Sequence, residues 1–270
     1  MSIHFLAVDG FNLIRRIFEA RKPEDQSGLM SVVESTAVSL RKALNRHSPS
    51  HAAVVLERHD RTWRHLLEPE YKANRSETPP LLVDNLDAFR EAFMALGVRC
   101  CEIDSYEADD VVATIAEVVA NHDGTAVILS TDKIYAQLLA PRIKIYDHFA
   151  DAFQDDATVL KRFKVQPRQL VDYLSMAGDR TNNIKGITGI GPKAACRLLD
   201  AFDSLDNILA WTEPSESTLE LDSGLRSALD KVQKNEIIAL RCRQLVTLKT
   251  DVSLGLNLKS FRIQTNQSIE

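Results

Sequence analysis

Seven acidic residues lie at the ends of apolar runs of the 270-residue chain or at the start of the segment that follows one: Asp9, Glu57, Glu107, Asp109, Asp110, Asp132 and Asp179. Carboxylates gathered at one place repel one another and raise each other's pKa, unless a hard divalent cation that prefers oxygen ligands binds among them. If the fold brings these acids together, they predict a magnesium site.

Three short apolar runs precede the first acids of the set. Residues 3–8 stop at Asp9, residues 52–56 stop at Glu57, and residues 126–129 stop just before Ser130, Thr131 and Asp132. The runs lack polar alternation and are rich in Val, Ile and Leu, which is typical of strands covered on both faces of a parallel sheet.

Residues 31–44, 81–96 and 109–120 carry apolar side chains at helical spacing between and after these runs. The alternation of strands and helices predicts an α/β fold with a mostly parallel central sheet and flanking helices. Because ligands bind beyond the carboxyl ends of strands in such sheets, we expect Asp9, Glu57 and Asp132 at one rim.

Glu107, Asp109 and Asp110 follow a fourth expected strand, residues 97–101, and precede an apolar helix. Asp104 and Glu107 have the spacing of a capping box, which predicts Asp104 as the N-cap. Acidic residues also favour the first turn of a helix because of its dipole, so capping alone explains one or two of them. Three acids within four positions exceed that need, and we expect Asp109, with Glu107 and Asp110 beside it, to bind metal.

Composition sets outer limits on the class of protein. The 33 Lys and Arg against 38 Asp and Glu give a formal charge of −5, which does not by itself favour a nucleic-acid partner. No apolar stretch has membrane-spanning length and the amino terminus lacks a signal-like segment, so we expect a cytoplasmic protein without a membrane partner. The four cysteines lack zinc spacing, and we assign them no chemistry.

A glycine-rich turn lies between two expected helices at residues 186–199. Glycines permit close backbone approach, and the amino end of the next helix presents free N–H groups to a phosphate, with Lys193 as a cationic contact. A tight turn between two antiparallel helices explains the same glycines. The Gly-Ile-Gly-Pro-Lys string favours phosphate binding, with Gly189, Ile190, Gly191, Pro192, Lys193 and Ala194 as the contact residues.

Residues 58–75 form a moderately basic stretch that includes Lys72 and Arg75, with Trp63 and Tyr71 interleaved. Charged stretches are more often merely solvated, but this one borders the proposed metal site. Its cations are suited to phosphates and its aromatic rings to splayed bases.

In this order along the chain, the motifs resemble those of the bacterial 5′ nuclease and flap endonuclease family, most closely its stand-alone exonuclease IX type. The matching segments are Val8-Asp9-Gly10, Tyr71-Lys72-Ala73-Asn74-Arg75, Glu107-Ala108-Asp109-Asp110, Ser130-Thr131-Asp132-Lys133, Gly178-Asp179, residues 186–193 and residues 245–251.

The resemblance implies a PIN-like 5′ nuclease fold with a helix-three-turn-helix DNA-binding region. It implies an α/β nuclease domain over residues 1–160, a helical DNA-binding region over 161–260 and a tail over 261–270. In that family the glycine turn binds duplex DNA around a potassium ion held by backbone carbonyls, which here belong to Met176, Ala177, Lys185, Ile187 and Ile190.

Two positions depart from the pattern that the resemblance implies. The family's Asp-Lys-Asp reads Asp132-Lys133-Ile134 here, and its Asp-x-x-Asp reads Asp179-Arg180-Thr181-Asn182. Isoleucine cannot bind magnesium and asparagine offers only a neutral carbonyl, so a second metal site at Asp132 and Asp179 is weakened. Glu57 replaces the family's usual aspartate but keeps a carboxylate.

The expected activity is Mg²⁺-dependent hydrolysis of phosphodiester bonds at 5′ single-strand to duplex junctions, during replication or repair, with Mn²⁺ as a substitute ion. Asp109, Lys72 and Arg75 are the expected catalytic residues. A weakly catalytic flap-binding protein and a ribonuclease of the related acidic-cluster type are the alternatives. We expect a monomer without an obligate protein partner.

Overall fold

The computed structural model describes residues 2–57, 61–212 and 221–263. The chain forms two compact units. The α/β unit comprises residues 1–63, 76–154 and 249–270, and the helical unit comprises residues 64–75 and 155–248. The domain bounds expected at residues 160 and 260 stay a prediction, and residues 264–270 of the expected tail lie outside the described residues.

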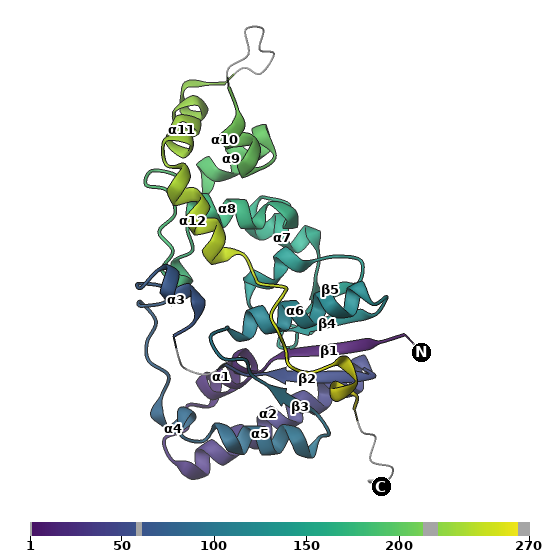
Figure 1. Cartoon of the computed structure of the whole chain (residues 1–270). Helices are drawn as coiled ribbons and strands as arrows, with labels where there is room; N and C mark the ends of the chain where they lie inside the picture. Colours follow the sequence, from purple (N-terminus) through teal and green to yellow (C-terminus); the bar gives the residue numbers. More distant parts are fainter. Residues whose placement is uncertain (1, 58–60, 213–220, 264–270) are drawn as a thin grey trace. The chain divides into compact units, whose positions relative to one another are not determined.

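A six-stranded sheet forms the centre of the α/β unit, with strand order β3-β2-β1-β4-β5-β6 (Figure 1). Neighbouring strands are parallel except for the pair β5 and β6, which is antiparallel. The mostly parallel α/β fold expected from the sequence is therefore confirmed. The strands are β1 (His4–Asp9), β2 (His51–Val55), β3 (Arg99–Cys101), β4 (Thr125–Leu129), β5 (Ile143–Asp147) and β6 (Ala152–Gln154).

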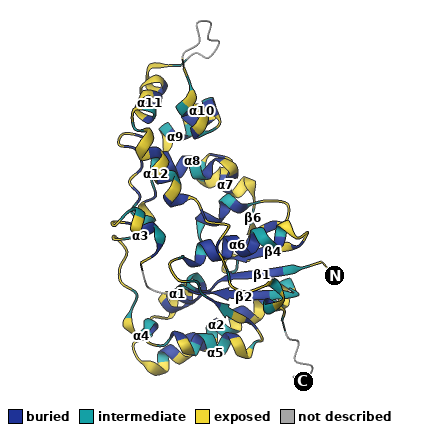
Figure 2. Cartoon of the chain, in the orientation of Figure 1, coloured by how far each residue is buried: buried dark blue, intermediate teal, exposed yellow. Residues whose placement is uncertain are grey.

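Alternate side chains of each strand enter two different cores, because successive residues of a strand point to opposite faces. Leu6, Val8 and Val54 pack with apolar residues of α1 (Gly10–Arg21), α2 (Gln26–His47) and α5 (Leu86–Ala95). The helix α6 (Ala108–Asn121) packs against β1 and β4. The central strands are consequently buried on both faces, as Figure 2 shows in dark blue.

The segment after β4 and the C-terminal segment complete this unit. The 3-10 helix η1 (Lys133–Leu138) follows β4, and η4 (Leu258–Phe261) contacts β2. Phe261 is buried and its ring packs edge-on against Phe5, with ring centroids 5.8 Å apart. A segment near the C-terminus thus packs against the strands β1 and β2 near the start of the chain.

The single helix expected over residues 81–96 is wrong. The structure has the short helix α4 (Pro80–Val83), a break, and then α5. The side-chain amide of Asn85 donates to the carbonyl of Leu81 over 2.9 Å, while the backbone N–H of Asn85 turns to Leu82. A side-chain donor thus takes the carbonyl that a continuing α-helix would have used.

The expected N-cap of α6 is also wrong. The cap is Glu107, which forms no side-chain capping bond, and the helix begins at Ala108. Asp104 lies in the turn before it, where Tyr106 N–H donates to Ile103. Asp104 therefore belongs to the preceding turn, and Glu107 directly precedes the first helical residue.

The helical unit contains residues 64–67 of α3 (Trp63–Leu67) and the helices α7 (Asp156–Phe163), α8 (Leu170–Ala177), α9 (Pro192–Phe202), α10 (Leu205–Ala210), α11 (Ser223–Lys234) and α12 (Glu236–Val246). The 3-10 turns η2 (Pro167–Gln169) and η3 (Arg180–Asn182) flank α8. Helix α8 packs against α12 and α9, and α9 packs against α10 and α11. Pro167 begins η2, which leads into α8, and Gly178 is the C-cap of α8. Among the described residues, no helix combines the length and apolar character that crossing a bilayer requires.

Candidate active site

The strand order reverses between β1 and β4, and a crevice at the carboxyl ends of the strands is expected there in an open α/β sheet. Asp9 ends β1, and Ser130 and Asp132 follow the end of β4. The charges of Asp132 and Glu57 act on Asp9, so these three acids lie near one another. The structure therefore brings together the acids that the sequence placed at one rim.

Asp9 is the buried centre of this group. Its Oδ1 accepts the N–H of Asn12 over 3.1 Å, as the N-cap of α1, and its Oδ2 accepts the hydroxyl of Ser130 over 2.9 Å. Burial raises the pKa of Asp9 to about 7, the two hydrogen bonds oppose the shift, and the charges of Asp132 and Glu57 add to it. Burial and the neighbouring acids thus disfavour the charge on this central carboxylate.

Tyr135 joins Asp9 to the start of α6. Its hydroxyl donates to Asp109 Oδ1 over 2.9 Å and lies 3.3 Å from Asp9 Oδ2. Burial and the neighbouring carboxylates hold the pKa of Tyr135 well above its ordinary value, so the hydroxyl remains a neutral donor. Tyr135 therefore fixes the position of Asp109 relative to Asp9.

Glu107 and Asp110 occupy the same first turn of α6, and both are buried. Asp110 Oδ1 accepts the backbone N–H of Lys249 over 2.9 Å, and Asp110 Oδ2 accepts the indole N–H of Trp63 over 2.9 Å. The ammonium of Lys249 also lies over the Trp63 ring, 5.1 Å from its centroid. Both oxygens of Asp110 thus fasten two distant segments to α6.

The donors of this edge suit a hard divalent cation, since the acids supply only oxygen ligands and burial makes their charge costly without a cation. Within the described ranges, however, no three His, Cys, Asp or Glu side chains already converge as the ligands of a formed metal site. Hydrogen bonds from Asn12, Ser130 and Tyr135 occupy the carboxylate oxygens instead. A bound ion would compete with these donors.

Asn12, Ser130 and Tyr135 are site residues that the sequence reasoning did not assign. Asn12 follows Asp9 by three positions, and its Oδ1 accepts from the backbone N–H and the hydroxyl of Thr131 over 3.2 and 3.1 Å. Tyr135 follows Asp132 by three positions. Polar residues one turn after an acid at a strand end are a signal that could have identified both.

In the helical unit, Asp179 begins a separate chain of hydrogen bonds. Asp179 is buried, and its Oδ2 accepts the side-chain amide of Asn182 over 2.9 Å. Asn182 Oδ1 accepts the guanidinium of Arg75 over 2.6 Å, and Arg75 also donates to the carbonyl of Thr181 over 3.2 Å. The asparagine amide thus links an acid to an arginine where the family pattern has a second carboxylate.

Lys72 lies beside this chain of bonds. Its backbone has φ 58° and its N–H donates to the carbonyl of Asn182 over 3.0 Å. Its ammonium is 5.3 Å from the centroid of the Tyr71 ring. The structure therefore brings Lys72, Arg75 and Asp179 together within the helical unit. Arg58 of the expected basic stretch lies outside the described residues.

The glycine turn brings two backbone segments into close contact. Gly178 and Gly186 have φ values of 82° and 67°, and a Cβ on Gly186 would lie 2.6 Å from the carbonyl oxygen of Met176. A Cβ on Gly178 would lie 2.8 Å from the carbonyl oxygen of Lys185. Only glycine fits at both positions, and the contact gathers the carbonyls of residues 176, 177 and 185.

The rest of the turn leads into α9. Ile187 N–H donates to the carbonyl of Met176, and Ile190 N–H donates to that of Ile187, each over 2.9 Å. Gly191 is the N-cap of α9 without a side-chain cap, and Lys193 is exposed in the first turn. The ammonium of Lys231 on α11 would lie 3.2 Å from a Cβ on Gly189, which makes Lys231 a cation of this turn that the sequence reasoning missed.

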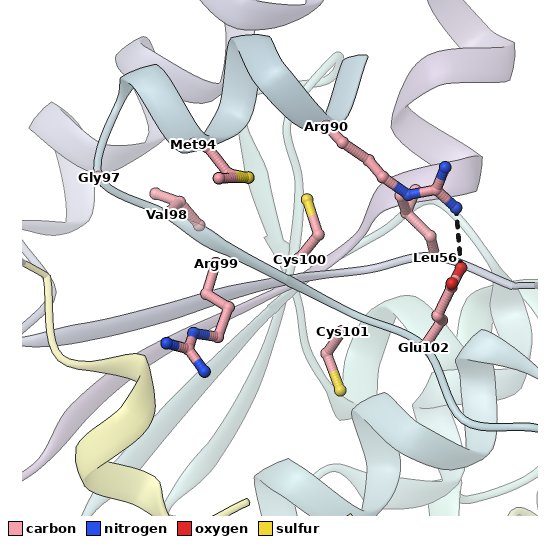
Figure 3. A pocket seen from close by; sticks show the side chains of 9 residues that line it. All are labelled: Leu56, Arg90, Met94, Gly97, Val98, Arg99, Cys100, Cys101 and Glu102. Atoms are coloured by element: carbon pink, nitrogen blue, oxygen red, sulfur yellow. Dashed lines mark hydrogen bonds and ion pairs between the residues drawn. The ribbon is translucent and has the colours of Figure 1, made fainter. Parts of the chain in front are cut away.

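A pocket of about 590 Å³ lies at the edge strand β3, and none of the predicted site residues lines it (Figure 3). Arg90 bonds Glu102 over 2.8 Å across it and Asp87 over 2.7 Å. Burial raises the pKa of the Cys100 thiol to about 11, so the thiol is neutral near pH 7. This pocket contains a structural ion pair and no activated nucleophile among the residues that line it.

Two family descriptions match the chain end to end: residues 4–166 match the N-terminal resolvase-like domain of 5′–3′ exonucleases, and residues 165–268 match their C-terminal SAM fold. The chain belongs to the 5′–3′ exonuclease family.

Among curated relatives, the flap endonuclease Xni of Vibrio cholerae serotype O1 is 38% identical over 270 residues, which is 99% of this chain and 100% of that protein. A zinc-bound 5′-exonuclease of T5 has a similar fold, with a TM-score of 0.74 at 20% identity over 91% of this chain and 90% of that one. The bacteriophage T5 flap endonuclease, in a complex with DNA and metal ions, has a TM-score of 0.68 at 21% identity and covers 90% of this chain and 88% of its own.

Proposed function

We propose that this protein is a structure-specific flap endonuclease and 5′–3′ exonuclease that hydrolyses DNA at 5′ single-strand to duplex junctions in replication or repair. The observation that supports this most strongly is the group of Asp9, Asp109 and Tyr135 at the reversal of strand order in a member of the 5′–3′ exonuclease family. The full-length similarity to a protein named flap endonuclease Xni favours flap DNA as the substrate.

Magnesium is the proposed catalytic ion, with Mn²⁺ as a substitute, because the available donors are carboxylate oxygens. Asp9, Glu57, Glu107, Asp109 and Asp110 are the proposed ligands, directly or through water. When bound, the ion polarises the scissile phosphate and lowers the pKa of the attacking water. Asp109 is the proposed ligand that is most accessible in the first turn of α6, because it is half-buried whereas Asp110 is fully buried.

The surrounding residues orient these acids. Ser130 and Asn12 donate to the two oxygens of Asp9, so they set the direction in which its remaining lone pairs face. Tyr135 donates to Asp109 and stays protonated at neutral pH. These bonds preorganise the acids, which reduces the reorganisation that binding an ion requires.

Lys72 and Arg75 of the helical unit are proposed to bind the phosphate and offset its developing negative charge. Arg75 is held by Thr181 and Asn182, which fixes its guanidinium without neutralising it with a carboxylate. The prediction that Asp132 and Asp179 share a second, weaker ion concerns residues of two separate units and stays a prediction.

Duplex DNA is the proposed partner of the glycine turn, through the residues 189–194 and the cations Lys193 and Lys231. The close approach of residues 176–178 and 185–187 fits a potassium ion held by backbone carbonyls, since Gly178 and Gly186 leave no side chain there. Helix N–H groups and cations that face a phosphate give binding with little base preference.

Cleavage of a labelled 5′-flap DNA tests the proposal, with Mg²⁺ or with chelator, and with Asp109→Ala compared with Asp123→Ala. Asp123 is an exposed acid that pairs with Arg142. Asp123→Ala removes one negative charge, as Asp109→Ala does. We expect cutting near the junction that requires Mg²⁺ and is lost only in Asp109→Ala.

Tight flap binding without cutting at any Mg²⁺ concentration would contradict the proposed nuclease activity and would favour the weakly catalytic DNA-binding alternative. An RNA of the same shape is the second substrate to test. Preferential cutting of that RNA would favour the ribonuclease alternative instead.

A further inference from the structure

A second surface pocket, of about 530 Å³, opens beside α1 and α2 in the α/β unit. Its polar and aromatic lining consists of Arg16, Glu19, Arg21, Ser35, Ser39 and Phe149, which we call the Phe149 pocket. Its volume lies within the range of small-molecule sites, which is about 300 to 1,000 Å³. None of these residues belongs to the acid cluster or to the glycine turn.

Phe149 supplies an aromatic ring that is partly exposed at the pocket. The residue lies in the turn between β5 and β6, is 43% exposed, and its N–H is fixed by the carboxylate of Asp147 over 2.9 Å. The guanidinium of Arg16 lies over the Phe149 ring, 5.2 Å from its centroid. A large apolar ring held at the surface in this way is suited to stacking by a planar ligand.

The two arginines of the pocket have no carboxylate partner. Arg16 and Arg21 are exposed, and within the described part of the chain neither forms an ion pair, although Arg16 contacts the Phe149 ring. The one acid of the lining, Glu19, is bound by Arg15 over 3.1 Å. The positive charges of Arg16 and Arg21 are therefore available to an anion, and arginine matches the geometry of phosphate.

Further cations and aromatic rings lie on neighbouring elements of the α/β unit. Lys42 lies one turn after Ser39 on α2, and its charge acts on His148, the neighbour of Phe149. Lys144 lies over the ring of Phe153, which is 45% exposed, at 5.9 Å from its centroid. Cations combined with exposed aromatic rings are typical of single-stranded nucleic-acid sites.

The Phe149 pocket lies close to the acid cluster along one helix. Asp9 caps α1, and Arg16 follows it by seven residues, which is about 10 Å along a helix axis. That distance is about three times the axial spacing of phosphates on one strand of a DNA duplex, which is about 3.4 Å.

We infer that the Phe149 pocket binds a nucleotide of the single-stranded part of the DNA substrate, with its base against Phe149 and its phosphate between Arg16 and Arg21. This inference rests on the proposed function. It adds a single-strand site on the α/β unit to the duplex site proposed for the glycine turn.

Fluorescence anisotropy of a labelled oligothymidine, in chelator so that no cutting occurs, tests the inference. Phe149→Ala is expected to weaken binding at least about fivefold, since stacking of a base on an aromatic ring contributes about 1 to 3 kcal/mol. Phe149→Tyr keeps the ring and is expected to stay within about twofold of the unaltered protein. Phe149→Leu keeps most of the apolar volume but not the aromatic face, so it is expected to behave like Phe149→Ala.

The double variant Arg16→Ala/Arg21→Ala is expected to flatten the dependence of log affinity on log salt by about 1.4, at about 0.7 for each lost phosphate contact with a single strand. Arg142→Ala removes one exposed arginine outside the pocket, and Met94→Ala removes a side chain that is 64% exposed elsewhere on the unit. Both controls are expected to bind as the unaltered protein does.

Flap cleavage by the same proteins distinguishes a failure of the single-strand site from a failure of the proposed function. If the unaltered protein cuts flaps while all pocket variants bind oligothymidine normally, the single-strand site is wrong and the proposed function stands. If Phe149→Leu binds as well as Phe149→Tyr, stacking is excluded and the inference fails. If the unaltered protein neither cuts flaps nor binds oligothymidine, both fail together.

Discussion

Asp109 and Asp110 are neighbours on α6, yet their hydrogen bonds give them different roles. Asp110 uses both oxygens to hold Lys249 and Trp63, whereas Asp109 accepts the hydroxyl of Tyr135, which also lies beside Asp9. A carboxylate that fastens two chain segments cannot turn toward an ion without releasing them. At the level of single residues, hydrogen-bond partners thus distinguish an acid that joins chain segments from one that contacts another residue of the site.

Two histidines with buried ring nitrogens make the stability of the protein depend on pH. His47 Nε2 and His148 Nδ1 are buried atoms without a hydrogen-bond partner among the described residues. Burial is the main cause that lowers the pKa of each below its ordinary value of 6.5. At His148, Lys42 and Arg46 lower the pKa as well, and Asp151 and Asp147 oppose them.

Because the unfolded chain takes up protons on these rings near pH 6.5 and the folded protein only at lower pH, their contribution to stability is lost as the pH falls below about 6.5. Asp9 acts in the opposite direction, because its pKa of about 7 favours the folded state as the pH falls, but it does so equally in a His148 variant. We therefore expect the urea midpoint of the unaltered protein to fall relative to that of His148→Asn between pH 7.5 and pH 5.5. The same change in both proteins would contradict the assignment to His148.

The glycine turn shows how an element depends on backbone conformation more than on side chains. Gly186 has φ 67°, and a Cβ there would lie 2.4 Å from Gly178 N. Gly191 has φ −96°, and a Cβ there would meet nothing within 4 Å. Two glycines five residues apart therefore serve different needs.

We expect Gly186→Ala to lower the free energy of unfolding by at least about 2 kcal/mol, because the substitution adds both backbone strain and a clash with main-chain atoms. Gly191→Ala is the matched control and is expected to change stability by less than about 1 kcal/mol. Urea unfolding of both variants measures the difference. Equal stabilities would mean that the turn relaxes without cost.

Arg64 joins two elements of the helical unit. Its side chain is fully buried and donates to the carbonyls of Leu245 and Thr247, over 2.8 and 3.1 Å, at the end of α12. The last carbonyls of a helix have no N–H donor within the helix, and these two carbonyls lie at such an end. The charged side chain thus completes the hydrogen bonding of the end of α12.

Arg64→Met is expected to lower the free energy of unfolding by about 3 kcal/mol, because two carbonyls lose a charged donor in a buried place. Arg142→Met breaks an exposed pair with Asp123 and is expected to cost less than about 1 kcal/mol. Thermal and urea unfolding compare the two. Similar losses in the two variants would show that burial does not increase the contribution of the Arg64 hydrogen bonds to the free energy of unfolding.

At the scale of the whole molecule, a net charge of −5 and a nucleic-acid substrate are compatible only if the charges are segregated. The acids gather at the carboxyl ends of the strands, and cations such as Lys193 and Lys231 gather at the glycine turn. Binding should therefore depend on local cations and on salt.

We expect flap-DNA affinity, measured in chelator, to fall at least about tenfold between 50 and 200 mM salt, as even two released counterions require. Lys193→Ala should flatten the slope of log affinity against log salt by about 1, whereas Arg142→Ala, with the same change of charge, should leave it unaltered. A slope near zero in the unaltered protein would contradict phosphate binding.

The order of residues was enough to predict the mostly parallel α/β fold, the rim where Asp9 lies beside Asp132 and Glu57, and the glycine turn. Short apolar runs, helical periodicity and glycine chemistry are local properties, and local properties can be read from the order of residues. Even so, the Asn85 amide broke an expected helix, since its competition with the backbone depends on one side-chain rotamer.

Only the tertiary structure decided the partners of each acid. Tyr135 reaches Asp9 across 126 positions of sequence, Trp63 and Lys249 reach Asp110 from opposite directions, and Phe149 reaches Arg16. Nothing in the spacing of these residues marks such pairs, because contacts between distant segments are set by how strands are ordered and helices are packed. The sequence therefore predicts where the chemistry lies, and packing decides which atoms perform it.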